Sequence, residues 1–216
     1  YLRQTYFQKV SSQRFIFSID LKKLDIHKSK KLKKKYDIIY FGRLSKDKGL
    51  LEFFKVIKKV LSQKDIKILL IGHLDINFKD EFYSEIFDNT VINNVDYLGY
   101  IKEEDLFDYI NRSKIFCFLS HYESQPSALL KALYCNLICV TSNIKSLNNH
   151  PYDKLKLFRF DSSNHNLISK KIIYFLNNYS KLTTNKKFQN EKDYLPSNSK
   201  NFKFIINKIF ELYEKS

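Results

Sequence analysis

The chain has 216 residues, of which 44% are hydrophobic and 28% are charged, so it can bury a core and lacks the composition of a disordered chain. Its 4 glycines and 3 prolines exclude fibrous and low-complexity classes, and no apolar run approaches the roughly 20 residues that span a bilayer. The formal net charge of +15 favours an anionic partner (nucleic acid, an anionic membrane surface or a phosphorylated substrate), and a bias of the whole chain toward Lys, Asn and Ile is the alternative cause.

Apolar runs alternate with helical periodicity along most of the chain. Residues 15–19 predict a short strand, and a Lys-rich stretch with six Lys in eight residues, 28–35, comes after it. We interpret this stretch first as a solvated linker and second as a contact with a membrane surface or an acceptor. Beyond it, short apolar runs predict buried strands at 37–41, 66–71, 95–98, 115–119, 137–141 and 155–160.

Between these strands, apolar side chains recur at helical spacing. The stretch 103–112 begins with three acidic residues, which suit the positive end of a helix dipole. The stretch 126–135 begins with Pro126, which favours the first helical position. Helices are therefore expected at 51–61, 79–91, 103–112, 126–135, 167–177 and 202–213.

Strands that alternate with helices predict a parallel sheet with helices on both faces, that is, an α/β domain of the Rossmann-like type. A doubly wound sheet of this type binds its ligand at the carboxyl ends of its strands. The loops in which a site is expected are therefore those that follow residues 41, 71, 98, 119 and 141.

Two glycines and several cations follow the first core strand, in the loop 42–49. Gly42 and Gly49 permit tight turns and close approach of the backbone. Arg43 offers a planar fork of donors that suits phosphate, and Lys48 offers a point charge. Together they could hold a diphosphate, although the loop has neither the Walker nor the dinucleotide glycine pattern. A solvated basic turn is the alternative interpretation.

The loop 120–126 leads from the strand at 115–119 directly into a helix. Backbone N–H groups at the start of a helix form a natural anion site. Glu123 lies beside them in the sequence, where a carboxylate can accept hydrogen bonds from sugar hydroxyls. The alternative is a capped helix with Glu123 on the surface.

Cysteines and histidines form no disulfide or metal-ligand pattern. Three cysteines form neither a disulfide framework nor a four-ligand site, and Cys117, in an apolar run, is expected to be a small buried hydrophobe. This cysteine usage predicts a reducing, cytosolic compartment. His73, His121 and His150 fall in loops near the predicted ligand edge without a partner at metal spacing, so we expect surface or hydrogen-bonded histidines.

Five motifs follow one another along the chain: Gly42-Arg43-Leu44 with Lys48-Gly49, then residues 68–72, 95–100, 120–123 and 126–130. In this order and spacing they resemble the retaining GT-B glycosyltransferases of family 4, also called the glycosyl transferase group 1 family. The resemblance covers residues 37–145 well and residues 15–20 and 155–176 loosely. It implies the C-terminal, donor-binding domain of the GT-B fold.

The resemblance also implies roles for individual residues. Arg43 and Lys48 match the cationic pair that holds the donor diphosphate in place of a metal ion, and the sequence contains no Asp-x-Asp metal motif. Glu123 matches the first acid of the family's Glu-x7-Glu motif, near the transferred sugar, and these three are the predicted catalytic residues. The predicted donor-binding residues are Gly42, then Gly99, Tyr100 and Ile101 at the base pocket, then Ser124, Gln125, Pro126, Ser127 and Ala128 around sugar and phosphate, and Lys131.

Three positions depart from the family pattern. The second acid of the Glu-x7-Glu motif, which contacts the nucleotide ribose in the family, falls at Lys131, and a lysine cannot accept a hydrogen bond. Lys131 could reach a phosphate instead, or the donor site is weakened. The loop at Ser124-Gln125 lacks the family's usual glycine, and residues 73–75 replace a Gly-x-Gly-like turn.

A GT-B enzyme closes two Rossmann-like domains on a cleft, and the chain has sequence for one of them. We therefore predict that residues 1–36 are a remnant and linker from an absent N-terminal acceptor domain and that residues 37–180 form the nucleotide-sugar-binding domain. Residues 181–216 are predicted to be a polar linker and a C-terminal helix. The chain alone is expected to bind donor nucleotide but not to transfer sugar.

The predicted reaction moves a sugar from a UDP-sugar or GDP-sugar to an acceptor hydroxyl, with retention of configuration and without a metal ion. By resemblance we expect a cytoplasmic protein of bacterial surface-polysaccharide or glycolipid synthesis, in peripheral contact with the anionic inner membrane face or a lipid-linked acceptor. The alternatives are a catalytically degenerate relative and another GT-B enzyme such as a sugar-nucleotide epimerase. A basic nucleic-acid-binding module is less well supported, because the aromatic residues lie mainly in apolar stretches, and no nucleic acid is expected.

Overall fold

Six strands form one sheet in the computed structural model, which describes residues 32–123, 126–144 and 157–184. The strands lie in the order β3-β2-β1-β4-β5-β6, and every neighbouring pair is parallel. This is the order of a doubly wound, Rossmann-like sheet, so the predicted fold class is confirmed. The strands are β1 (Tyr36–Phe41), β2 (Ile68–Ile71), β3 (Val95–Tyr97), β4 (Ser113–Phe118), β5 (Ile138–Ser142) and β6 (Leu157–Phe160).

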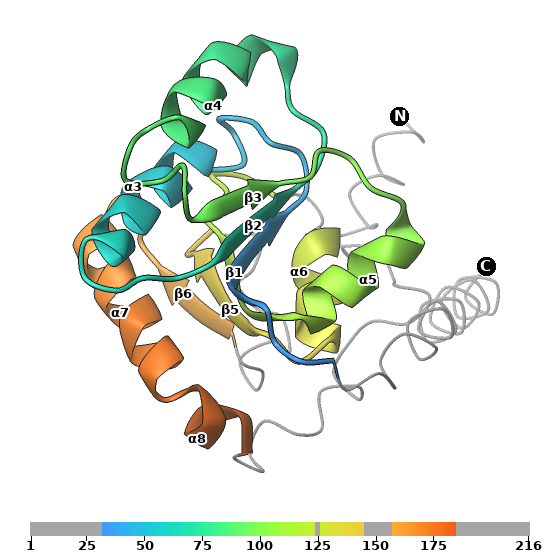
Figure 1. Ribbon diagram of the computed structural model, residues 1–216, viewed down its shortest axis with the longest axis vertical. Helices are drawn as coiled ribbons and strands as arrows, with labels where there is room; N and C mark the ends of the chain where they lie inside the picture. The colour runs from blue at the N-terminus through green and yellow to red at the C-terminus, as the bar shows by residue number, and fades with distance from the viewer. Residues whose placement is uncertain (1–31, 124–125, 145–156, 185–216) are drawn as a thin grey trace, which may run out of the picture. The chain divides into compact units, whose positions relative to one another are not determined.

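Helices cover both faces of this sheet (Figure 1). On one face α3 (Leu50–Leu61) packs against α7 (His165–Asn177), with α4 (Lys79–Ile86) beside α3. On the other face lie α5 (Glu103–Asn111) and α6 (Ser127–Tyr134). Within the described ranges, no helix is long and apolar enough to cross a bilayer.

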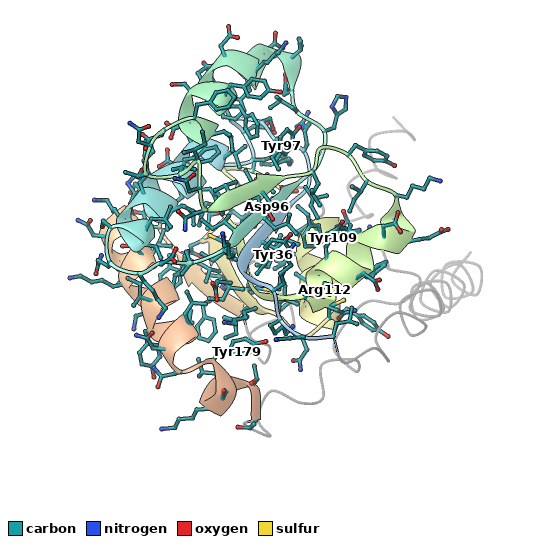
Figure 2. All side chains as sticks on the ribbon, in the orientation of Figure 1. Tyr36, Asp96, Tyr97, Tyr109, Arg112 and Tyr179 are labelled. Carbon is teal, nitrogen blue, oxygen red and sulfur yellow. The ribbon has the colours of Figure 1, made fainter. Side chains whose placement is uncertain are left out.

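The core lies between the sheet and its two layers of helices. The four central strands are buried along almost their whole length, whereas the edge strands β3 and β6 are partly exposed. Coverage on both faces explains why the central strands are continuous apolar runs in the sequence. Tyr40 of β1 meets the fully buried Phe53 of α3 edge-on, with ring centroids 5.7 Å apart. The hydroxyl of Tyr36 donates to Asp96 Oδ2 at 2.9 Å and links β1 to β3 across β2 (Figure 2).

Several element boundaries differ from the predictions. The helix expected over 79–91 ends at Ile86, because the side chain of Asp88 accepts hydrogen bonds from the backbone and hydroxyl of Thr90 and competes with helical bonds. Pro126 is the N-cap of α6 rather than its first helical residue. The second strand begins at Ile68, not at residue 66.

Two short helical elements were not predicted: η1 (Ile76–Phe78), a 3₁₀ turn before α4, and α8 (Tyr179–Thr184), which follows α7. The domain boundaries at 36 and 180 stay predictions, and the second falls inside α8. The strand predicted at 15–19 and the helix predicted at 202–213 lie outside the described residues.

Candidate functional site

The topological switch point of the sheet lies between β1 and β4. These two strands are neighbours, but the chain leaves β1 for α3 on one face and leaves β4 for α6 on the other. The loops that follow them therefore diverge at the carboxyl edge of the sheet, which is where doubly wound sheets bind ligands. The two loops singled out in the sequence thus begin side by side at this point.

The two loops are in backbone contact. Gly49, the N-cap of α3, has φ 69°, and a Cβ there would lie 1.8 Å from the carbonyl oxygen of Leu119, so only glycine fits. The N–H of His121 donates to the carbonyl oxygen of Asp47 at 3.0 Å, and the hydroxyl of Ser120 donates to the same oxygen at 3.3 Å. These contacts hold the loops in a fixed relation to each other.

Lys48 and Glu123 form an ion pair across the two loops. Lys48 Nζ lies 2.8 Å from Glu123 Oε1 and 3.4 Å from the carbonyl oxygen of Tyr122. The Glu123 side chain is 8% exposed and the Lys48 side chain 19%. A carboxylate at such depth is costly without a partner, and Lys48 supplies that partner. The structure thus brings two of the three predicted catalytic residues within hydrogen-bond distance.

Arg43, the third predicted catalytic residue, lies in the same loop as Lys48. Its guanidinium pairs with the Asp47 carboxylate at 2.8 Å. Asp47 also accepts a hydrogen bond from Ser45 at 2.5 Å. Burial by itself raises the pKa of Asp47, but the Ser45 hydrogen bond and the charges of Arg43 and Lys48 outweigh it and hold the pKa below its ordinary value. Each predicted cation therefore has a carboxylate partner, and an anionic ligand must compete with Asp47 and Glu123 for them.

Lys131, on α6, pairs with Glu103, the first residue of α5. Glu103 follows closely after the predicted base loop, Gly99-Tyr100-Ile101, in which Tyr100 is 79% exposed. Residue 131, where the second acid of the Glu-x7-Glu motif was expected, is thus a lysine that pairs with an acidic residue of another helix. A carboxylate is present beside residue 131, although residue 131 does not supply it.

Gly42 and residues 126–128, which were also predicted to bind the donor, lie along the carboxyl edge of the sheet. Gly42 continues β1, and its N–H donates to the carbonyl oxygen of Ile71 at 3.0 Å. Pro126, Ser127 and Ala128 form the start of α6, where Ser127 is exposed. Ser124 and Gln125 lie outside the described residues, and their role stays a prediction.

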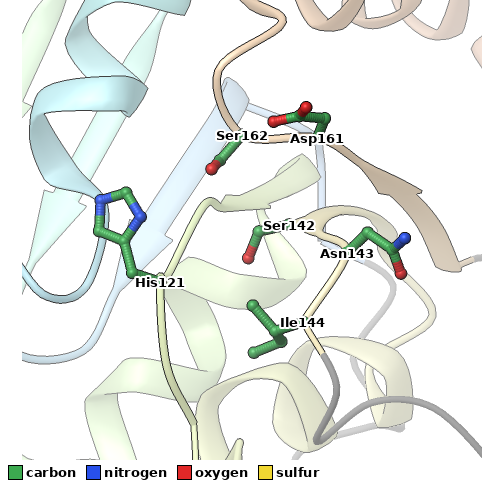
Figure 3. A pocket seen from close by; sticks show the side chains of 6 residues that line it. All are labelled: His121, Ser142, Asn143, Ile144, Asp161 and Ser162. Atoms are coloured by element: carbon green, nitrogen blue, oxygen red, sulfur yellow. The ribbon is translucent and has the colours of Figure 1, made fainter.

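A polar cavity of about 260 Å³ lies at the ends of β4, β5 and β6 (Figure 3). Four of its lining residues come from the loops after residues 119 and 141, where a site was expected, but none of them was predicted to bind a ligand. His121 is exposed, as expected for a surface histidine, but it also lines this cavity. The loop after residue 160 also lies at the carboxyl edge of the sheet, where ligands bind, and it was not among the loops in which a site was expected. The lining residues are His121, Ser142, Asn143, Ile144, Asp161 and Ser162.

In the described part of the chain, no group of three or more His, Cys, Asp or Glu side chains is placed to hold a metal ion. Metal independence of the reaction stays a prediction. All three cysteines are buried thiols, and burial raises the pKa of Cys117. The expectation that Cys117 is a small buried hydrophobe is confirmed.

Sheet order and the two loops at the switch point define an α/β domain of the Rossmann-like class. Within that class, the chain belongs to the family of glycosyl transferases group 1, whose profile matches residues 22–192. CapH of Staphylococcus aureus, a capsular polysaccharide biosynthesis glycosyltransferase, is 29% identical over 116 residues, which are 52% of this chain and 32% of CapH. The matching part of the chain thus spans about a third of the length of that relative.

Solved structures of glycosyltransferases share the fold. The C-terminal domain of LpcC, a glycosyl transferase group 1 family protein of Francisella tularensis, has a TM-score of 0.63 at 20% identity, over 84% of this chain and 93% of that domain. HepE of Anabaena, solved in complex with UDP and glucose, has a TM-score of 0.70 at 13% identity, over 89% of this chain and 55% of HepE. At these identities the likeness concerns the fold, which is that of the Rossmann-like domains of GT-B glycosyltransferases.

Proposed function

We propose that this chain is the C-terminal, donor-binding half of a two-domain retaining glycosyltransferase of family 4, and that it binds a nucleoside-diphosphate sugar at the switch point of its sheet. Membership of the group 1 family supports the transfer of a sugar. The likeness to a C-terminal domain over 93% of that domain supports a second, N-terminal Rossmann-like domain that binds most of the acceptor. The UDP and glucose held by HepE support a nucleotide sugar as the ligand.

The ion pair between Lys48 and Glu123 carries this proposal. It joins the two loops at the switch point, and its carboxylate is buried. A diphosphate that enters here competes with Glu123 for Lys48 and with Asp47 for Arg43, so its charge meets two cations held in place beforehand. Once Lys48 has turned to the diphosphate, the Glu123 carboxylate accepts hydrogen bonds from hydroxyls of the sugar.

In the proposed reaction the bond between the anomeric carbon and the diphosphate oxygen breaks, and the acceptor oxygen bonds to that carbon with retention of configuration. The proton of the acceptor hydroxyl passes to the released diphosphate. Arg43, Lys48 and the N–H groups at the start of α6 stabilise the negative charge that develops on the leaving diphosphate, in place of a metal ion. Gly42 and the backbone of residues 124–128 surround the sugar and phosphates. The base lies on residues 99–101, beside the Lys131 side chain.

The same proposal includes the setting of the enzyme. Residues 37–180 form the donor domain in this proposal. The likeness to CapH supports a role in bacterial surface-polysaccharide or glycolipid synthesis. The compartment that we propose for this role is the cytoplasm. The net charge of +15 supports peripheral contact with an anionic membrane or a lipid-linked acceptor, and no nucleic acid is expected to bind.

Thermal unfolding in the presence of nucleotides tests the donor site. The melting temperature of the chain is measured with UDP, GDP and ADP at rising concentrations. A ligand at 100 times its Kd stabilises the folded state by about 2.7 kcal/mol. We expect a shift with UDP or GDP, and we expect the double variant Arg43→Ala/Lys48→Ala to abolish it.

Lys46→Ala is the matched control for that variant. Lys46 is an exposed cation in the same loop, but it pairs with Glu81 of α4, away from Glu123. The Lys46→Ala variant should therefore keep the full nucleotide shift. A shift that survives in Arg43→Ala/Lys48→Ala would place the ligand elsewhere, and no shift with any of the three nucleotides would contradict donor binding by this chain.

A catalytically degenerate relative that still binds a nucleotide sugar is the second candidate, and the pair of Lys131 with Glu103 favours it. Lys131 cannot accept a hydrogen bond from a ribose hydroxyl. The two candidates differ in transfer rather than in binding. The two-domain protein transfers sugar in the first case and binds the nucleotide without transfer in the second. Transfer by the present chain alone would contradict the assignment of acceptor chemistry to another domain.

A further inference from the structure

The polar cavity beside the switch point is distinct from the proposed diphosphate site. It lies among the loops that follow β4, β5 and β6, and its volume is about 260 Å³ (Figure 3). Sites for drug-sized ligands usually measure about 300–1,000 Å³. The cavity therefore has room for one small ring rather than for a whole nucleotide.

The lining of the cavity suits hydroxyl groups. Asp161 supplies a carboxylate, Asn143 an amide with donors and an acceptor, His121 two ring nitrogens, and two serines supply hydroxyls. Neither Lys nor Arg is among its lining residues in the described part of the chain, so no lining cation offsets the charge of a phosphate. Ile144 adds an apolar surface for the C–H face of a ring. This combination matches an uncharged saccharide.

Asp161 is held in place as an acceptor. Its Oδ1 accepts hydrogen bonds from the N–H of Ser163 at 2.9 Å and from the hydroxyl of Ser163 at 2.7 Å. The hydrogen bond from the Ser163 hydroxyl lowers the pKa of Asp161 most, and the hydrogen bond from the Ser163 N–H lowers it further. The carboxylate is therefore ionised at neutral pH. Within the described ranges its Oδ2 has no hydrogen-bond partner and can accept one from a ligand.

The cavity is preformed, because its loops are bonded to one another. The N–H of Asn143 donates to the carbonyl oxygen of Phe160 at 2.7 Å and joins the loops after β5 and β6. The hydroxyl of Ser142 donates to the carbonyl oxygen of Ser120 and joins the loops after β5 and β4. A site that needs little ordering loses less conformational entropy when a ligand binds.

We infer that this cavity binds one uncharged hexose unit of the acceptor saccharide. The inference rests on the proposed function and takes the acceptor hydroxyl of that reaction to belong to a saccharide, which the likeness to a capsular polysaccharide glycosyltransferase supports. His121 and Glu123 are two residues apart on one loop, so their Cα atoms lie within about 7 Å of each other. The donor's own sugar is anchored through its diphosphate to Arg43 and Lys48. A cavity with its own hydrogen-bonding groups, and without Lys or Arg among its described lining residues, suits a unit that lacks this anchor.

Binding of simple glycosides to the chain, without nucleotide, tests this inference. Saturation-transfer NMR is recorded with the methyl glycosides of glucose, galactose and N-acetylglucosamine. At least one is expected to bind. Asp161→Asn keeps the Oδ1 acceptor and its turn but removes the negative charge. Because hydrogen bonds to ionised acceptors are roughly twice as strong as those to neutral ones, this variant should weaken glycoside binding at least about tenfold. Asn143→Ala should weaken it as well.

Two further variants make the result specific. Asp80→Asn removes an exposed carboxylate on α4, away from the cavity, and should bind the glycoside as the wild type does. Arg43→Ala/Lys48→Ala should lose nucleotide stabilisation but keep glycoside binding, so failure of the donor site and failure of the cavity are distinguishable. The inference is overturned if none of the three glycosides binds, if Asp161→Asn and Asn143→Ala both bind normally, or if glycoside binding is lost with Arg43 and Lys48.

Discussion

Replacing Gly49 with alanine should force apart the two loops that carry Lys48 and Glu123. The backbone at Gly49 has φ 69°, where a residue other than glycine costs about 1–3 kcal/mol. The added Cβ would lie 1.8 Å from the carbonyl oxygen of Leu119 and 2.3 Å from its carbon, and these backbone atoms directly follow β4 and cannot simply rotate away. Overpacking of this kind costs about a further 1–3 kcal/mol. We therefore expect Gly49→Ala to lower the free energy of unfolding by about 2–6 kcal/mol.

Gly99→Ala separates the two causes of this loss. Gly99 has nearly the same backbone angle, φ 67°, but a Cβ there would meet no atom within 4 Å. Replacing Gly99 with alanine should therefore lower the free energy of unfolding only by the cost of the unfavourable backbone angle, about 1–3 kcal/mol. Urea unfolding of the wild type and both variants, followed by circular dichroism, gives the difference between the variants, which measures the contact with Leu119. Equal stability of Gly49→Ala and Gly99→Ala would refute the argument that the loops touch at Gly49.

The hydrogen-bonded contact of His165 with Glu52, which joins α7 to α3, should make stability fall at acid pH. Burial by itself raises the pKa of Glu52, but hydrogen bonds from His165 and Lys55 lower it below its ordinary value of 4.5, so the stabilisation is complete above pH 4.5 and is lost as the pH falls through the lower folded-state pKa. Glu52→Gln should therefore flatten the acid limb of a profile of melting temperature against pH, and identical profiles would contradict this. Lys131→Glu should lower the melting temperature because the new carboxylate would face Glu103, and adding Glu103→Lys should restore it. A double-mutant cycle should give a coupling of about 0.2–1 kcal/mol, whereas strictly additive effects would speak against the pair. A thiol reagent should react slowly with the folded chain, because all three cysteines are buried, and should label three sites after denaturation. Rapid labelling of the folded chain would contradict the packing of the core.

The fold class could be predicted because it depends on patterns that are local in the sequence. Buried strands appear as apolar runs and helices as apolar faces, and their alternation permits few architectures other than a covered parallel sheet. The helix expected over 79–91 was too long because its end depends on a tertiary contact as well as on the turn at Thr90. Asp88, where the chain turns, also pairs with Lys58 of α3 at 2.8 Å, and no local pattern reveals that partner.

The type of fold, the order of its elements and the two loops at the switch point could all be read from the sequence, because periodicity and strand ends are properties of neighbouring residues. Which charged side chains pair with each other depends on the tertiary structure. Lys48 pairs with Glu123, 75 residues away, and Lys131 pairs with Glu103 from another helix. The polar cavity also belongs to the tertiary structure, because its walls come from three loops that the parallel sheet alone brings to one edge.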